Sequence, residues 1–161
     1  MKKIKTALIS LSDKTNLRQL LRILQNYKIK IISSGGTHKA IKKLGFNSLD
    51  ISSFTKFPEI LNGRVKTLHP KLYAGILIKR NDKSHMRQLK INNFSEIDLV
   101  IVNFYPFEKT LKKTKSEDKI IEKIDIGGPS LVRAAAKNFK YVTVISSAND
   151  YMKLYLSLIH I

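Results

Sequence analysis

Residues 62–70 (Asn-Gly-Arg-Val-Lys-Thr-Leu-His-Pro) bring several side chains able to do chemistry into one short stretch. Arg64 can fork onto two oxygens of a phosphate, whereas Lys66 carries a compact charge whose proton affinity responds to burial. We therefore predict that Arg64 and Thr67 bind an anion and that Lys66 both binds and transfers protons. The alternative is a surface loop whose cations only form salt bridges. His69 could act in acid–base chemistry or hold a turn, and we leave it outside the catalytic set.

A second segment, Ser-Ser-Gly-Gly-Thr at residues 33–37, joins a predicted strand to a predicted helix. Glycines in such a turn bring backbone N–H groups close to an anion, and the helix dipole favours negative charge. The alternative is an ordinary N-cap turn, and the spacing does not match the G-x-G-x-x-G dinucleotide motif. We predict that the binding residues of this segment are Ser34, Gly35, Gly36 and Thr37.

A third segment and two single residues also follow predicted strands. Ser12-Asp13-Lys14-Thr15 offers a hydroxyl and a cation, and we include Ser12 and Lys14 in the binding set, although the segment could equally be a helix cap. Asn103 and Tyr105 come at the end of another strand, where the amide can bind a carboxamide and the phenol can donate a hydrogen bond. Both could instead be structural.

A fourth segment, Asp-Ile-Gly-Gly-Pro at residues 125–129, precedes a predicted helix that Pro129 is well suited to open. Arg133 and Lys137 are four residues apart and share a face of that helix. A carboxylate before a helix is commonly a cap, but beside so many cations we predict that Asp125 faces a ligand. The same segment adds two residues to the predicted binding set, Ile126 and Gly127.

The elements that must position these segments alternate along the chain. Leu17, Leu20, Leu21 and Leu24 have the spacing of a helix with one buried stripe. Short runs that are apolar on both faces predict strands at 5–10, 30–33, 98–103 and 141–146. Further helices are predicted after residue 37 and at 83–91, 117–124 and 130–138. This alternation predicts an α/β fold, a mostly parallel open sheet with helices on both faces, whose ligands bind beyond the carboxyl ends of the strands.

Composition limits the possible functions. A chain of 161 residues with 43% apolar content fits one compact domain. The net charge of +18 suggests nucleic-acid binding, but the lysines are dispersed, so we expect a solvated surface and no specific nucleic-acid partner. The absence of Cys excludes thiolate chemistry and fits a cytoplasmic location. The four His residues are too widely spaced to predict a metal site. The apolar run after Met1 is short and lacks a cleavage site, and no run has the length of a membrane span.

The four segments together resemble those of the IMP cyclohydrolase domain, which forms the N-terminus of the bifunctional AICAR transformylase/IMP cyclohydrolase family and has a methylglyoxal-synthase-like fold. The resemblance extends from Ala7 to about Tyr151. It implies ring closure of formyl-AICAR to IMP with loss of water, in purine biosynthesis, without cofactor or metal. It also implies a nucleotide cradle of Lys14, Ser34, Gly36, Thr37, Arg64 and Thr67, with Asn103 near the base and catalytic roles for Lys66, Tyr105, Asp125 and Lys137.

The resemblance further implies that residues 1–153 form the cyclohydrolase domain, that 154–161 are a truncated or non-native tail, and that the transformylase domain of the family is absent. Formyl transfer would need that domain, and homodimerisation in the family depends largely on it. Methylglyoxal synthase and the regulatory domain of carbamoyl-phosphate synthetase share the domain type and remain alternatives. A small basic nucleic-acid-binding module is the alternative from a different class.

Overall fold

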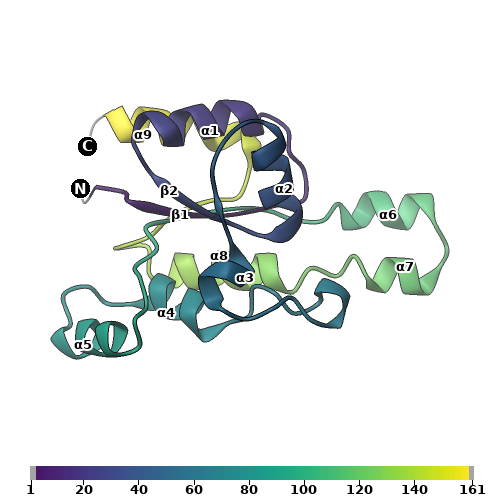
Figure 1. Cartoon of the computed structure of the whole chain (residues 1–161). Coiled ribbons are helices and arrows are strands. Elements are labelled where there is room, and N and C mark those ends of the chain that lie inside the picture. Colours follow the sequence, from purple (N-terminus) through teal and green to yellow (C-terminus); the bar gives the residue numbers. More distant parts are fainter. Residues whose placement is uncertain (1–2, 160–161) are drawn as a thin grey trace.

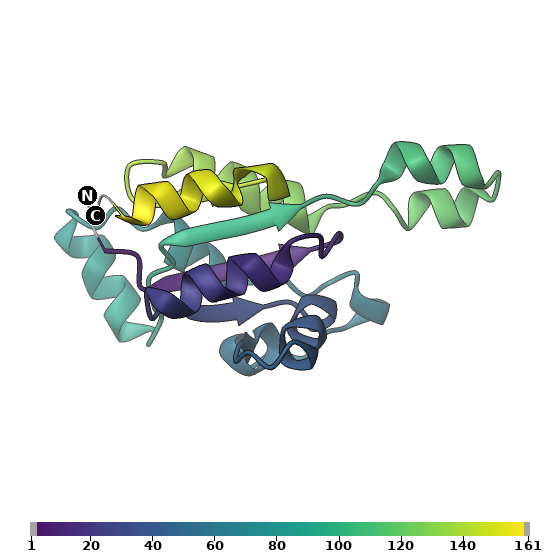
Figure 2. The ribbon, with the colours of Figure 1, turned by 90° about the horizontal axis from the view of Figure 1, so that it is seen from above.

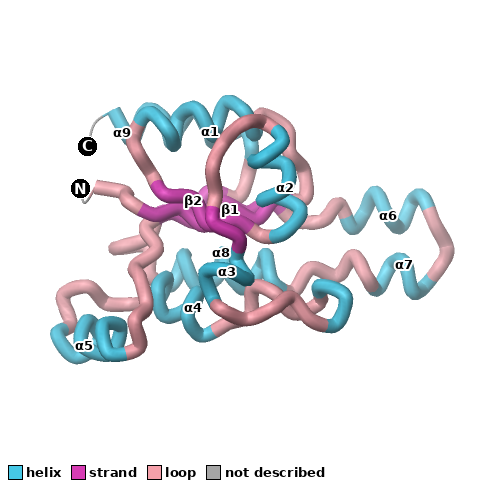
Figure 3. Tube along the Cα trace, viewed as in Figure 1, coloured by secondary structure: helices cyan, strands magenta, loops and turns pink. Residues whose placement is uncertain are grey.

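The computed structural model describes residues 3–159, and within them five parallel strands form one sheet in the order β3-β2-β1-β4-β5 (Figures 1 and 3). The central strand β1 pairs with β2 on one side and β4 on the other, with Leu8 opposite both Ile32 and Val100. The sheet therefore has the parallel α/β architecture that the sequence predicts. The strands are β1 (Thr6–Leu11), β2 (Lys30–Ser33), β3 (Leu49–Asp50), β4 (Leu99–Asn103) and β5 (Thr143–Ile145).

Alternate residues of β1 pack into two different hydrophobic layers. Ala7 and Ile9 belong to one layer and Leu8 to the other, and all three are fully buried. Because successive side chains of a strand point to opposite faces, such a strand needs cover on both sides. Helices α1 (Leu17–Asn26), α2 (Gly35–Lys43) and α9 (Tyr151–Ile159) cover one face, and α3 (Ile51–Thr55), α4 (Pro70–Leu77) and α8 (Gly127–Lys137) cover the other (Figure 1).

Some elements lie outside these layers. Helices α6 (Phe107–Lys113) and α7 (Glu117–Ile121) form a hairpin that extends away from the sheet (Figures 1 and 2). All residues of this hairpin's two helices are described, and none of them is buried. Helix α5 (Lys83–Ile91) lies at the opposite end of the domain (Figure 1). Two short 3-10 helices, η1 (Leu61–Gly63) and η2 (Ala148–Asp150), complete the described secondary structure.

An ion pair joins the chain at the amino end of the sheet. The Arg80 guanidinium lies 2.7 Å from Asp98 Oδ1, and both side chains are almost fully buried. The other oxygen of Asp98 accepts hydrogen bonds from the backbone N–H groups of Lys5 and Thr6, each at 2.8 Å. This carboxylate therefore joins the starts of β1 and β4, at the edge of the sheet that carries none of the predicted binding segments.

The four strands and five helices predicted from the sequence are present, with shifted ends. The sequence did not predict β3, α3, α4, α6 or α9. β3 is only two residues long, and α6 lacks the buried stripe from which an amphipathic helix is identified. No helix in residues 3–159 combines the length and hydrophobicity needed to cross a membrane.

Most of the segment expected to be a truncated or non-native tail, residues 154–161, belongs to helix α9 in the described part of the chain. Leu154 and Leu158 are 2% and 5% exposed and pack in the layer formed by α1 and β1. The expected boundary after residue 153 therefore falls inside a packed helix, α9. Residues 160 and 161 lie outside the described part of the chain.

We expect Leu154→Ala to lower the free energy of unfolding by about 2–5 kcal/mol, because it removes a buried side chain and leaves a cavity. The matched control is Leu156→Ala on the exposed side of α9, where Leu156 is 52% exposed; its effect should stay within about 0.5 kcal/mol. Urea denaturation followed by circular dichroism measures both. Equal and small effects would contradict the packing of α9 against the domain.

Candidate active-site cleft

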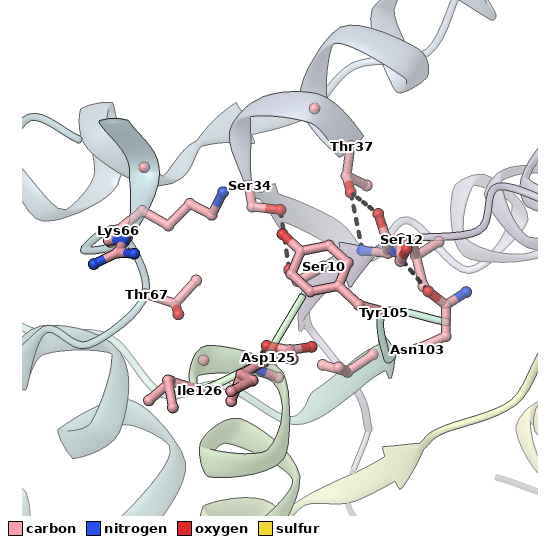
Figure 4. A pocket seen from close by; sticks show the side chains of 18 of the residues that line it. Ser10, Ser12, Ser34, Thr37, Lys66, Thr67, Asn103, Tyr105, Asp125 and Ile126 are labelled. Carbon is pink, nitrogen blue, oxygen red and sulfur yellow. Dashed lines mark hydrogen bonds between the residues drawn. The ribbon is translucent and has the colours of Figure 1, made fainter. Parts of the chain in front are cut away.

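A cleft of about 520 Å³ opens at the carboxyl ends of β1, β2 and β4, between the amino ends of α2 and α8 (Figure 4). This is the position that open parallel sheets offer to ligands. The structure brings together here thirteen of the residues singled out from the sequence. They are Ser12, Lys14, Ser34, Gly36, Thr37, Arg64, Lys66, Thr67, Asn103, Tyr105, Asp125, Ile126 and Gly127.

Two side chains hold the end of β1, which forms the floor of the cleft. Thr37 is buried, and its hydroxyl accepts from Leu11 N at 2.9 Å and lies 3.2 Å from Leu11 O. The Asn103 amide oxygen accepts from Ser12 N and Asp13 N, while its nitrogen donates to Asp13 O at 2.7 Å. Both residues therefore stabilise the loop after β1, which is the structural role that the sequence left open for Asn103.

Hydroxyls and one cation line the side of the cleft next to β1. The Ser34 hydroxyl lies 3.0 Å from that of Ser10, a contact drawn in Figure 4. The Lys14 ammonium donates to the carbonyl oxygens of Leu11 and Ser12 at 2.9 and 2.8 Å. These bonds hold the lysine side chain folded back over its own loop, with its charge at the cleft wall.

The loop that contains Lys66 is shaped by unusual backbone geometry. Three consecutive residues, Leu61, Asn62 and Gly63, have positive φ angles of 54°, 53° and 88°, and an antiparallel bridge between Ile60 and Val65 closes the turn. A Cβ on Gly63 would collide with the Glu59 carboxylate. Glycine is therefore required at position 63 both by its φ angle and by the space available.

Each cation of this loop has a carboxylate partner. Lys66 Nζ lies 3.8 Å from Glu59 Oε1, and in Figure 4 the Lys66 side chain extends across the cleft toward Ser34. Arg64 Nε donates to Glu122 Oε1 at 2.9 Å, and a second guanidinium nitrogen of Arg64 contacts the same oxygen. The hydrogen bond to Glu122 raises the pKa of the Arg64 guanidinium above its usual value. The cations thus face the cleft as members of ion pairs.

The amino end of α8 closes the cleft from below. Asp125 Oδ1 accepts from Gly128 N at 2.8 Å, so the carboxylate caps the helix and also lines the cleft. A Cβ on Gly128 would lie 2.5 Å from Asp125 Oδ2, and a Cβ on Gly127 would collide with the Thr67 hydroxyl. Both glycines are therefore needed for close approach, of the Asp125 carboxylate and of the Thr67 loop respectively.

The base of the α6–α7 hairpin forms the outer wall. Tyr105 lines the cleft just before α6, and the Lys123 ammonium lies 5.2 Å from the centre of its ring, within the range of a cation–π contact. Glu122 and Ile124 line the cleft where the chain returns from α7. The base of the hairpin is therefore part of the cleft lining.

Two residues of the predicted set lie elsewhere. Gly35 does not line the cleft; a Cβ there would approach the Glu59 carboxylate at 3.3 Å, so its small size serves packing. Lys137 lines a shallow depression with Tyr73 and Arg133. It lies ten residues beyond the first residue of α8, which carries it about 15 Å along the helix axis. Its position therefore does not support the predicted catalytic role in this cleft.

His69 caps α4, so it has the structural role that the sequence analysis considered for it. Its Nδ1 accepts from Lys71 N at 3.1 Å, and its ring packs 5.9 Å from that of Phe57. Among residues 3–159, no group of three or more His, Asp or Glu side chains is arranged to hold a metal ion.

Sequence reasoning missed several residues of the cleft. Ser10 lies two residues before Ser12 in the same strand-end segment, a signal that could have identified it. Glu122 gave no such signal, because its contact with Arg64 joins positions 58 residues apart. The remaining cleft residues outside the predicted set are Leu11, Asn62, Gly63, Val102, Ile121, Ile124 and Gly128.

The chemistry available in the cleft follows from these parts. Cationic side chains, hydroxyls and two helix amino ends favour an anion, and phosphate is the anion that such an arrangement holds well. Next to them lie a carboxylate, Asp125, an ammonium, Lys66, and a phenol, Tyr105. These groups can orient and protonate a polar ligand group beside the bound anion.

The fold is that of a known domain class, because residues 16–130 match the family described as the MGS-like domain. The chain therefore belongs to the MGS-like domain family. Its similarity to particular proteins is also high. It is 53% identical over 149 residues to the bifunctional purine biosynthesis protein PurH of Acetivibrio thermocellus, covering 92% of this chain. It is 50% identical over 147 residues to PurH of Clostridioides difficile and 46% identical over 152 residues to PurH of Agrobacterium fabrum.

The chain spans only about 29% of the length of these PurH relatives. A solved structure of more similar size is also related. The crystal structure of ForH superposes with a TM-score of 0.83 at 30% sequence identity, and the match covers 98% of this chain and 80% of ForH. The domain can therefore be compared with a protein of nearly its own extent as well as with longer relatives.

We expect Thr37→Val to destabilise the domain by about 1–3 kcal/mol, because it keeps the side-chain shape but leaves the N–H of Leu11 without its buried acceptor. Thr143→Val on the exposed start of β5 is the matched control and should change stability by no more than about 0.5 kcal/mol. Thermal and urea unfolding of both variants measure the difference. Equal stabilities would mean that Thr37 does not hold the end of β1.

Proposed function

We propose that the cleft is the active site of an IMP cyclohydrolase, which closes the purine ring of formyl-AICAR to give IMP and water. The observation that carries the proposal is that Lys66, Tyr105 and Asp125 lie in one cleft with further cations, hydroxyls and two helix amino ends. The PurH names of relatives with up to 53% identity support purine biosynthesis as the context. The proposal concerns this domain alone, since formyl transfer would belong to the longer PurH relatives.

The substrate's phosphate would bind at the amino end of α2. Backbone N–H groups around Gly36 and the hydroxyl of Ser34 face the cleft there, and Lys14 and Arg64 supply positive charge from two sides. A helix amino end of this kind binds phosphate without a metal ion. The resemblance stated from the sequence assigns the same residues to the nucleotide cradle, and we expect no cofactor.

The ring closure forms a bond between the carboxamide nitrogen and the formyl carbon, and the formyl oxygen leaves as water after taking up two protons. One proton comes from the carboxamide nitrogen and the other from the formamide nitrogen. We assign stabilisation of the developing oxyanion to Lys66, helped by Tyr105, and orientation of the carboxamide to Asp125. The Asp125 carboxylate is fixed in advance, because its Oδ1 accepts the Gly128 hydrogen bond. Both reacting groups belong to one molecule, so holding them in the reactive rotamer contributes as well.

The first test is IMP formation from formyl-AICAR by this domain, followed by ultraviolet absorbance and chromatography. We expect turnover above the spontaneous rate, and Lys66→Ala should lower it by about 10²–10⁴-fold, the usual contribution of a positioned acid or base. Lys90→Ala, on α5 at the opposite end of the domain, removes the same charge and should leave turnover unchanged. Unaltered turnover in Lys66→Ala would rule out its catalytic role.

A second test separates the chemistry of Asp125 from its cap. Asp125→Asn keeps an oxygen able to accept from Gly128 N but removes the negative charge, whereas Asp125→Ala removes both. We expect both variants to lose turnover by about 10²-fold or more, and only Asp125→Ala to lose about 1 kcal/mol of stability. If Asp125→Asn kept full activity, the residue would be a cap alone. Paired kinetics and thermal unfolding give the answer.

An IMP titration at two salt concentrations distinguishes a cyclohydrolase from a nucleic-acid-binding module. A cyclohydrolase should bind IMP in preference to inorganic phosphate. A nucleic-acid-binding module should instead bind polyanions with an affinity that falls steeply with salt and show little preference for purine monophosphates.

A further inference from the structure

The Arg64–Glu122 pair joins two segments of the cleft lining that are 58 residues apart in the chain. Arg64 directly follows η1, and Glu122 follows the last residue of α7. Both residues line the cleft. Their side chains are 62% and 54% exposed, so the pair is in contact with water and can exchange for another partner.

The hairpin that carries Glu122 has no hydrophobic anchor in the core. None of the residues of α6 and α7, all described, is buried, and the two helices pack against each other (Figure 2). Three apolar side chains at its base and along it, Leu111, Ile121 and Ile124, are 43–53% exposed. Elements with few buried apolar contacts open at a low cost in free energy. A polar contact at the base of the hairpin can therefore influence its position.

The Glu122 carboxylate and a ligand phosphate would compete for the same guanidinium, that of Arg64. Glu122 Oε1 occupies the Nε edge of the guanidinium, the same edge that can fork onto two oxygens of a phosphate. A dianionic phosphate that enters the cleft next to Glu122 is repelled by its carboxylate and attracted by Arg64. Lys66 has an equivalent partner in Glu59, at the longer distance of 3.8 Å and outside the hairpin.

We propose that Glu122 is a specificity-determining residue, a counter-ion that a ligand phosphate must displace from Arg64, so that occupancy of the cleft is coupled to release of the α6–α7 hairpin. The inference rests on the proposed function for the identity of the ligand, a purine nucleoside monophosphate. A dianionic phosphate competes with a carboxylate for a guanidinium, whereas an uncharged nucleoside does not. Glu122 therefore lowers the affinity for the phosphate while leaving contacts to the base and ribose unchanged.

The test compares IMP and inosine binding by calorimetry at fixed ionic strength in the unmodified domain, Glu122→Gln and Glu117→Gln. Glu117→Gln removes the same charge at the other end of α7. We expect Glu122→Gln to bind IMP about two- to fivefold more tightly, the size that an exposed ion pair contributes. Inosine binding should not change, and Glu117→Gln should leave both affinities unaltered.

Hydrogen exchange of residues 107–121 provides the second readout. Saturation with IMP should speed exchange of the hairpin in the unmodified domain, whereas in Glu122→Gln exchange should already be fast without ligand. Glu59→Gln is the control that alters the partner of the other cation, Lys66, and should leave hairpin exchange unchanged.

The outcomes separate this inference from the proposed function. Weaker IMP binding by Glu122→Gln would overturn it, because Glu122 would then orient Arg64 rather than compete for it. Equal changes for IMP and inosine would overturn it too, because the phosphate would not be the group concerned. If the unmodified domain bound no IMP, the proposed function would fail, and inorganic phosphate would serve as the probe of the hairpin. The coupling holds if phosphate speeds hairpin exchange and is overturned if it does not.

Discussion

The cleft depends on the backbone at the carboxyl end of β1 being held from both neighbouring strands. Thr37, at the start of α2 after β2, bonds to the N–H and carbonyl of Leu11, and Asn103, the last residue of β4, bonds to Ser12 and Asp13. Buried polar groups of this kind are costly unless they are paired, so the pairing allows few alternative loop positions. The ammonium of Lys14 bonds to the carbonyls of this loop, and the hydroxyls of Ser10 and Ser34 lie 3.0 Å apart beside it. Thr37 and Asn103, which the sequence predicts as ligand-binding residues, thus hold the cleft in shape as well as lining it.

The second feature of the cleft is that three of its charged side chains already have partners within the protein. Arg64 pairs with Glu122, Lys66 with Glu59, and Asp125 with the amino end of α8. Exposed ion pairs contribute little to stability, so these pairs can be exchanged at low cost. The glycines contribute by allowing close approach: Gly127 admits the Thr67 hydroxyl, and Gly63 admits the Glu59 carboxylate. A cleft built in this way can bind an anion by exchanging partners rather than by creating new buried charge.

The two ends of the strands have different roles, since the amino ends stabilise the sheet and the carboxyl ends line the cleft. At the amino ends of the strands, the buried Arg80–Asp98 pair joins β1 to β4 and faces no cleft residue of the proposed site. At the carboxyl ends, loops and helix amino ends leave polar groups facing the cleft. Between them, the apolar layers on both faces, with α9 included, hold β1 in place. The hairpin α6–α7 stands outside this arrangement, and only the base of the hairpin contributes to the cleft.

The sequence by itself determined the alternation of strands and helices, because apolar runs and helical spacing are local, and with it the edge of the sheet where Ser34, Arg64 and Asp125 would meet. It did not determine β3 or α6, where a two-residue strand and a helix without buried residues give weak local patterns, nor α9, whose buried stripe of Tyr151, Leu154 and Leu158 lies among exposed apolar residues. Only the tertiary structure decided which side chains touch. It pairs Arg64 with Glu122, which is 58 positions away, and bonds Asn103 to the loop after β1. It also places Lys137 along α8, outside the cleft. Local spacing fixes the face of a helix and the end of a strand, whereas contacts between distant segments depend on how the layers pack.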